Sequence, residues 1–211
     1  MRAGSPDAPL RALVQAIAAG DAAAARTILA AAPELARERA RKGASRQEET
    51  PHWLDAIQHY LYVGDTALHI AAAAYQKDIA VDLIARGADV RARNRRGAEP
   101  LHYAADGVPA SAAWNPDAQA ATIACLIAAG ADPNAADKSG VAPLHRAVRT
   151  RCAAAVRALL EGGADARVRN GNGSTPGLLA TRNTGRGGAG TPEAKAQQHE
   201  IVRLLKAYGA K

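Results

Sequence analysis

PLHYAADG occupies residues 100–107, and close variants of it stand at two other places: ALHIAA at residues 67–72 and PLHRAV at residues 143–148. All three stretches contain Leu-His-x-Ala, so one short chain writes the same pattern three times. The three histidines could assemble one site, or they could mark one structural unit that is copied along the chain. The spacing between the copies separates these two interpretations.

Three sequence markers agree on the spacing. The histidines of the three stretches, His69, His102 and His145, are separated by 33 and 43 residues. Steps of 33, 43 and 33 residues separate the turn glycines Gly64, Gly97, Gly140 and Gly173. Steps of 43 and 33 residues separate the Gly-Ala-Asp triplets at 87–89, 130–132 and 163–165. These steps indicate a 33-residue unit, with about ten extra residues in the second copy and about thirteen in the fourth, and such self-similarity is typical of a helical solenoid.

Each copy has the same internal order. A glycine turn precedes the Leu-His stretch, which we expect to form a short helix. A second helix is predicted because apolar residues recur three and four positions apart, as in DIAVDLIARGAD at residues 78–89. A glycine ends each second helix, where a left-handed backbone is favoured. The remaining residues return as a finger to the next turn glycine.

These motifs resemble the ankyrin repeat, whose signature is Gly-x-Thr-Pro-Leu-His-x-Ala-Ala followed by Gly-Ala-Asp-Val-Asn. The resemblance covers residues 64–211. It implies an all-α solenoid of paired antiparallel helices, with β-hairpin fingers projecting at right angles. It also implies that His69, His102 and His145 hydrogen-bond their own turns and the neighbouring repeats. Members of the family bind proteins, usually through the concave face made of fingers and first helices.

The alternative for these histidines is a metal or catalytic cluster. Adjacent repeats stack roughly 10 Å apart, the distance between packed helices, so equivalent histidines form a ladder and do not converge on one ion. The motif also varies: Glu99 and Ala142 replace the usual Thr, and Leu178 replaces the His of the last copy. Such variation suits a structural ladder and not a shared site.

We expect about five repeats, of which the first and last are degenerate caps. The predicted order is a disordered N-terminus (1–9), a degenerate capping repeat with a long finger insertion (10–63), an ankyrin repeat (64–96), a repeat with an insertion between its helices (97–139), a further repeat (140–172), and a C-terminal capping repeat with a Gly-rich insertion (173–211).

The two ends of the array need caps, because a terminal repeat would otherwise expose the core. At the N-terminal end, Thr50-Pro51 is a plausible helix start. Trp53, Ile57 and Tyr60 follow at helical spacing, and we expect this helix to seal the array. At the other end Lys206 stands where earlier copies have Ile or Leu, as a polar outer cap requires.

The composition supports a thin helical core and indicates the charge of a partner. The chain is 48% hydrophobic, but only 3% is aromatic and it has no Phe. The formal net charge of +7 favours acidic partners, whether an acidic protein face, nucleic acid or a membrane surface. An excess of Arg over Lys indicates a GC-rich, bacterial genome. Cys125 and Cys152 form no Cys-x-x-Cys pair, so we interpret them as small buried hydrophobes in a reducing compartment.

Two further motifs have a structural alternative. His52, Asp55 and His59 would share one helix face and could ligate zinc, but no Cys or fourth ligand stands at motif spacing, so we favour a solvated helix face. GRGGAG at residues 185–190 matches the glycine pattern of a dinucleotide-binding loop. It has neither the preceding strand nor the following acidic residue, which favours a flexible loop.

Partner-binding residues are predicted from side chains that the repeat does not need for packing. The fingers carry several cations. The two inter-helix insertions, roughly 107–120 and 182–198, flank the short loop of the repeat between them, and we predict a basic notch there with Trp114 on its wall. The alternative is that Trp114 covers its own loop and the arginines are solvated. The candidate residues are Arg93, Arg95, Arg96, Trp114, Lys138, Arg146, Arg149, Arg151, Arg169, Arg182 and Arg186.

The sequence therefore predicts a non-catalytic, cytoplasmic protein-interaction module: a scaffold, adaptor or inhibitor that binds an acidic protein. We expect a monomer without cofactor, metal or membrane association. The alternative function is a basic nucleic-acid-associated protein, although Arg residues are interleaved with Asp and Glu and no nucleic-acid motif is present. A metal protein or enzyme that uses His52, Asp55 and His59 is the third hypothesis.

Overall fold

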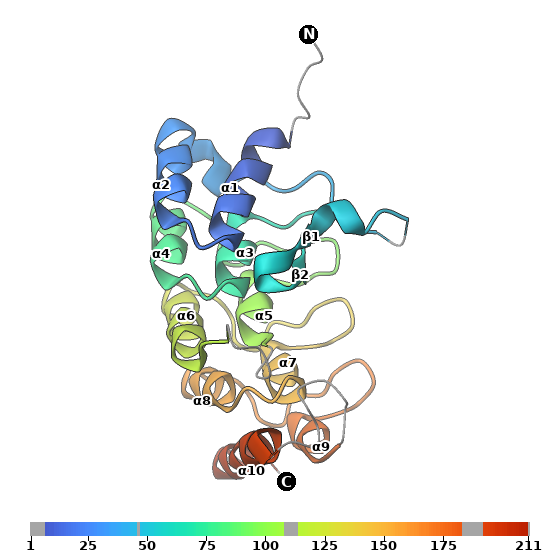
Figure 1. Cartoon of the computed structure of the whole chain (residues 1–211). Coiled ribbons are helices and arrows are strands. Elements are labelled where there is room, and N and C mark those ends of the chain that lie inside the picture. Colours follow the sequence, from blue (N-terminus) through green and yellow to red (C-terminus); the bar gives the residue numbers. More distant parts are fainter. Residues whose placement is uncertain (1–6, 46, 108–113, 183–191, 211) are drawn as a thin grey trace.

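The chain folds as a row of helix pairs (Figure 1), seen here in a computed structural model that describes residues 7–45, 47–107, 114–182 and 192–210. The inner row contains α1 (Ala8–Ala18), α3 (Ala67–Ala73), α5 (Pro100–Ala105), α7 (Pro143–Arg149) and α9 (Pro176–Thr181). The outer row contains α2 (Ala22–Ala31), α4 (Lys77–Ala85), α6 (Pro116–Ala128), α8 (Ala153–Glu161) and α10 (Pro192–Ala207). This arrangement confirms the predicted all-α solenoid.

The helix boundaries follow from local backbone chemistry. Proline stands at the first position of α5, α7 and α9, where its missing N–H costs nothing. Gly87, Gly130 and Gly163 follow α4, α6 and α8 with φ values of 86°, 99° and 93°, a left-handed conformation that side chains disfavour. The predicted glycine stops are therefore confirmed. Ala8 and Pro9, which we expected to be disordered, already belong to α1.

The core is a thin layer between the two rows of helices. Leu68, Leu101 and Leu144 occupy equivalent positions on the inner helices, and each is completely buried. Alanines fill much of the remaining contact, as at Ala71 and Ala104. Small side chains let neighbouring helices approach closely, so a chain with few aromatic residues can still close its core. Cys152 belongs to this core, and burial raises its pKa to about 12; both cysteines are unpaired.

The fingers stack on one another through their turns. The N–H of Arg95 donates to the Val63 carbonyl at 2.8 Å, and the N–H of Lys138 donates to the Arg96 carbonyl at 3.0 Å. The N–H of Gly171 continues this series to the carbonyl of the previous finger turn. Asn94 of the second finger is buried, and its side-chain oxygen accepts two backbone N–H groups of the turn.

The insertion in the first finger is a hairpin, not the predicted helix. A short 3-10 turn, Thr50–His52, leads into β1 (Trp53–Leu54); a second turn, Asp55–Ile57, leads into β2 (His59–Tyr60). Gln58 closes the hairpin with φ of 48°. Trp53 pairs with Tyr60 across the strands, and their ring centroids lie 4.7 Å apart. This cross-strand contact explains the spacing of apolar residues that resembled a helix face.

The C-terminal end is only partly polar. Lys206 is exposed, which agrees with its expected place on the outer cap. Leu178 and Tyr208 are exposed as well, with 43% and 45% of their surface accessible. The last repeat therefore leaves some apolar surface uncovered in the described part of the chain.

A buried carboxylate joins the insertion to two repeats. Asp65 is completely buried and accepts the Tyr103 hydroxyl at 2.8 Å, the Asn94 amide at 2.8 Å and the backbone N–H of Tyr62 at 2.7 Å. Burial raises the pKa of Tyr103 well above its ordinary value, so this hydroxyl stays protonated and donates. The network fixes the end of the insertion to the second finger and to α5.

We predict that Asp65→Ala lowers the free energy of unfolding by about 3 kcal/mol, because it leaves buried donors without their acceptor. Tyr103→Phe removes one donor and should cost about half as much. The exposed Asp117 offers a control, and Asp117→Ala should change stability by about 0.5 kcal/mol. Urea unfolding followed by circular dichroism measures all three variants. Equal effects of Asp65→Ala and Asp117→Ala would contradict a structural role for the network.

Candidate functional site

The three motif histidines connect consecutive repeats. In each, Nδ1 accepts the backbone N–H three residues earlier, at 3.1 Å, from Thr66, Glu99 and Ala142. Because Nδ1 is an acceptor, Nε2 carries the proton and donates it to the next repeat. The accepting carbonyls are Ala98 at 3.1 Å, Val141 at 3.0 Å and Ser174 at 3.1 Å. These contacts agree with the structural interpretation of His69, His102 and His145.

The same histidines are held in the neutral form. Burial lowers the pKa of His69 and of His145, and it lowers the pKa of His102 to about 4. Both ring nitrogens are occupied by the backbone, so neither is available for proton transfer to a ligand. Within the described part of the chain, no three His, Cys, Asp or Glu side chains are grouped so that they could hold a metal ion.

The three residues weighed as zinc ligands, His52, Asp55 and His59, do not converge on the insertion. His52 is buried, and burial lowers its pKa. Asp55 accepts the indole N–H of Trp53 at 3.3 Å. The His59 ring donates to the Tyr60 carbonyl at 2.9 Å and stacks on Tyr103, with ring centroids 4.4 Å apart. The hairpin directs these three side chains to different neighbours, so the helix face that would have gathered them does not exist.

The predicted basic notch is largely occupied by internal contacts. Arg146 pairs with Asp106 at 2.8 Å and with Asp137 at 3.1 Å, and only 13% of its side chain is exposed. Arg149 is half-buried, with a guanidinium nitrogen 3.9 Å from Asp106. Arg151 is buried and donates to the Arg182 carbonyl at 3.4 Å. Arg146 and Arg151 thus join repeats, and they are not open to a partner as predicted.

Arg151 also has a positional counterpart that sequence analysis missed. Tyr75 and Arg151 stand in equivalent turns between helices, with φ values of 55° and 60°. The Tyr75 hydroxyl donates to the carbonyl of Asp106, the C-cap of α5, at 2.6 Å. Arg151 contacts the C-cap of α9 in the same way. The first repeat has Gly20 at this turn position, where the backbone is also left-handed. A large residue at the same position in later repeats was the sequence signal for these contacts.

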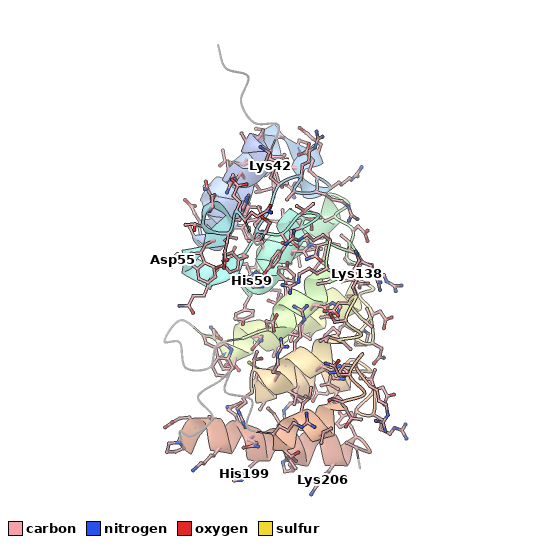
Figure 2. All side chains as sticks on the ribbon, turned by 90° about the vertical axis from the view of Figure 1, so that its right-hand side faces the viewer. Lys42, Asp55, His59, Lys138, His199 and Lys206 are labelled. Atoms are coloured by element: carbon pink, nitrogen blue, oxygen red, sulfur yellow. The ribbon has the colours of Figure 1, made fainter. Side chains whose placement is uncertain are left out.

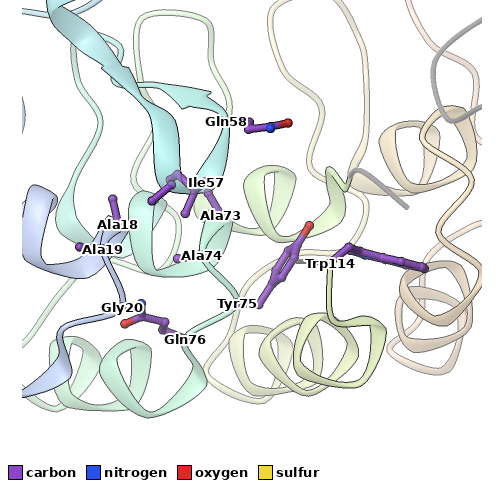
Figure 3. A pocket seen from close by; sticks show the side chains of 11 residues that line it. Ala18, Ala19, Gly20, Ile57, Gln58, Ala73, Ala74, Tyr75, Gln76 and Trp114 are labelled. Carbon is purple, nitrogen blue, oxygen red and sulfur yellow. The ribbon is translucent and has the colours of Figure 1, made fainter. Parts of the chain in front are cut away.

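Trp114 lies beside the start of α6. Its indole N–H donates to the Gln119 side chain at 2.9 Å, and its ring lines an open cavity of about 330 Å³ together with Tyr75 and Ile57 (Figure 3). Alanines from the ends of α1 and α3 form much of the remaining wall. The lining is more apolar than polar, although Gln58 and Gln76 also contribute to it. The bond to Gln119 in the same repeat agrees with the alternative interpretation of Trp114.

The cations of the fingers fall into two groups. Arg91 lies 3.7 Å from Asp132, and Arg93 lies 3.0 Å from Glu99. In contrast, Arg95, Arg96 and Lys138 are exposed and have no carboxylate within 4.0 Å among the described residues. Of the other candidates, Arg169 and Arg182 are exposed, whereas Arg186 and the GRGGAG stretch at 185–190 lie outside the described residues.

Aromatic side chains of the insertion support two of these arginines. The guanidinium carbons of Arg95 and Arg96 lie 5.5 Å and 5.0 Å from the centroid of the Tyr62 ring. Tyr60 lies beside Tyr62, at a centroid distance of 6.3 Å. Sequence analysis did not connect these residues, because it assigned the insertion to a capping helix far from the second finger. The alternation of Tyr60 and Tyr62 along an extended segment was the signal that could have found them.

Comparison with protein-family models gives two matches. The model described as ankyrin repeat matches residues 63–95, and the model described as ankyrin repeats (many copies) matches residues 126–176. A search of curated proteins finds no match. In the described part of the chain, no helix is both long and apolar enough to cross a membrane.

The histidine ladder predicts a specific pH dependence. Below its ordinary pKa of about 6.5, a histidine takes up a proton in the unfolded chain but resists it in the fold. The free energy of unfolding should therefore fall as the pH is lowered from about 6.5 to about 4, with about 3 kcal/mol lost through His102 alone.

Urea unfolding across this pH range tests the ladder with two variants. His102→Gln keeps a donor but does not titrate, so its stability should depend less steeply on pH than that of the unmodified chain. His199 is exposed on α10, and His199→Gln should leave the pH dependence unchanged. An unchanged slope for His102→Gln would show that His102 does not contribute to the acid sensitivity.

Proposed function

Because this chain is an ankyrin-repeat protein, and ankyrin repeats are generally protein-interaction modules, we propose that it is a non-catalytic scaffold, adaptor or inhibitor that binds an acidic surface of a partner protein. The proposed binding side is the one from which the hairpin and the fingers project (Figure 2). Ankyrin-repeat proteins are generally non-catalytic, and the backbone contacts of the three motif histidines agree with that role.

The distribution of charge is the observation that carries this proposal. The four finger segments 37–42, 89–96, 132–138 and 165–169 together contain eleven Lys or Arg and five Asp or Glu. This excess of six accounts for nearly all of the formal net charge of +7. The excess therefore lies along one edge of the array, where it attracts and orients an acidic partner.

The shape of the array supports a protein partner. Stacked repeats provide an extended, rigid surface and no deep polar pocket, which suits a protein face better than a small substrate. Several finger arginines are already neutralised by carboxylates, including Arg91 and Arg93. This interleaving of charge weakens attraction to a continuous phosphate backbone, which needs many unpaired cations in a row.

Affinity capture from nuclease-treated lysate of the native cell tests the function. The immobilised chain should retain acidic proteins, which are released as the salt concentration rises. The double variant Arg96→Glu with Lys138→Glu should lose this capture. Lys77→Glu with Lys195→Glu makes the same change of charge at exposed positions near the starts of α4 and α10, where acidic residues are tolerated, and should retain it.

Two outcomes would contradict the proposal. Equal capture by both double variants would show that the finger edge does not bind the partner. Recovery of nucleic acid alone, when nuclease is omitted, would favour the nucleic-acid-associated alternative.

A further inference from the structure

The insertion and the second finger hold two arginines in a fixed arrangement. Arg95 and Arg96 lie over the ring of Tyr62, and such cation–π contacts stabilise a guanidinium in one place. Tyr62 is itself anchored, because its backbone N–H donates to the buried carboxylate of Asp65 at 2.7 Å. Arg95 also donates to the backbone carbonyl of Ala44. We call Tyr62, Arg95 and Arg96 the arginine clamp.

The backbone beneath the clamp is tightly packed. A Cβ atom added at Gly43 would lie 2.4 Å from the carbonyl carbon of Tyr62, so the two segments approach each other more closely than any side chain would allow. The N–H of Ala44 donates to the carbonyl of Leu61 at 2.7 Å. These contacts fix residues 43–44 against residues 61–62 within the insertion, and the N–H of Arg95 joins the second finger to it at the carbonyl of Val63.

The charges of the clamp are uncompensated within the described part of the chain. Neither Arg95 nor Arg96 has a carboxylate within 4.0 Å, whereas Arg91 and Arg93 on the same finger are both paired. Lys138 extends this positive surface, since its backbone N–H bonds to the Arg96 carbonyl at 3.0 Å. In Figure 2, Lys138 marks the third finger and His59 marks the neighbouring hairpin.

We propose that the arginine clamp is a docking site for an extended acidic segment of the partner protein, and that it binds adjacent carboxylates of that segment. This inference rests on the proposed function. Guanidinium groups match carboxylates through two parallel hydrogen bonds, and two neighbouring arginines can engage two neighbouring acids. Because the clamp is held before binding, less side-chain freedom is lost when the partner docks.

The surroundings of the clamp favour a peptide over single-stranded nucleic acid. Stacking of bases needs free aromatic faces, but two guanidinium groups already lie over Tyr62. The rings of Trp53 and Tyr60 pack against each other at 4.7 Å. The Tyr60 hydroxyl also donates to Glu49, so both the ring and the hydroxyl of Tyr60 already have partners on the insertion.

Fluorescence anisotropy with a defined probe tests this site. The probe is a labelled Gly/Ser peptide that carries two Glu-Glu pairs; the matched peptide has Gln in place of Glu. The chain should bind the Glu peptide and not the Gln peptide. Arg95→Gln with Arg96→Gln should reduce the affinity about tenfold, the scale of an interface hot spot. Tyr62→Leu keeps the charge but removes the support, and should reduce the affinity about threefold.

A matched control separates the clamp from general attraction. Arg157→Gln with Arg203→Gln removes the same charge from exposed positions on α8 and α10, outside the fingers, and should change the affinity less than about twofold. Circular dichroism and thermal unfolding show whether each variant is folded. If Tyr62→Leu displaces the insertion, the variant Arg95→Gln with Arg96→Gln still tests the site.

Three results would overturn the clamp. Equal losses in the two arginine double variants would leave the proposed function standing but assign binding to diffuse charge. If the chain does not bind the Glu peptide but still captures acidic proteins, the clamp is not the docking site, and the proposed function remains supported. Tighter binding of a labelled thymidine oligonucleotide, lost in the same clamp variants, would make the site a nucleic-acid site.

Discussion

The continuity of the array depends on one interaction: a neutral imidazole that accepts from its own helix start and donates to the carbonyl of the next repeat. His69, His102 and His145 each make both contacts. A buried carbonyl without a donor is costly, so each ring satisfies the neighbour as well as its own turn. In the C-terminal repeat Leu178 replaces the histidine and stands exposed.

The features that recur in every repeat could be predicted from the sequence. Period, helix pairs, glycine stops and the role of the histidines all follow from patterns that recur in each copy, so each copy checks the others. The insertion occurs once, and its apolar spacing fits a helix face as well as a cross-strand pair. Only the pairing of Trp53 with Tyr60 decides between them, and that pairing depends on Gln58 adopting a left-handed turn.

The candidate binding residues were harder to predict, because their availability depends on partners distant in sequence. Arg146 and Arg96 look alike in a list of cations, yet Arg146 meets Asp106 and Asp137 across repeat boundaries, whereas Arg96 meets an aromatic ring. A basic sequence therefore contains two kinds of arginine. One kind forms ion pairs between repeats, and the other is the kind that we propose binds a partner.

The insertion also gives the array a direction. In a simple solenoid each repeat contacts only its neighbours, and structure can be lost from either end. Here Asp65 and Asn94, with the Tyr103 hydroxyl on α5, tie the N-terminal insertion to two successive repeats. The C-terminal end lacks such a brace among its described residues and exposes Leu178 and Tyr208. We therefore expect local opening to occur more easily in the C-terminal repeat than in the braced half.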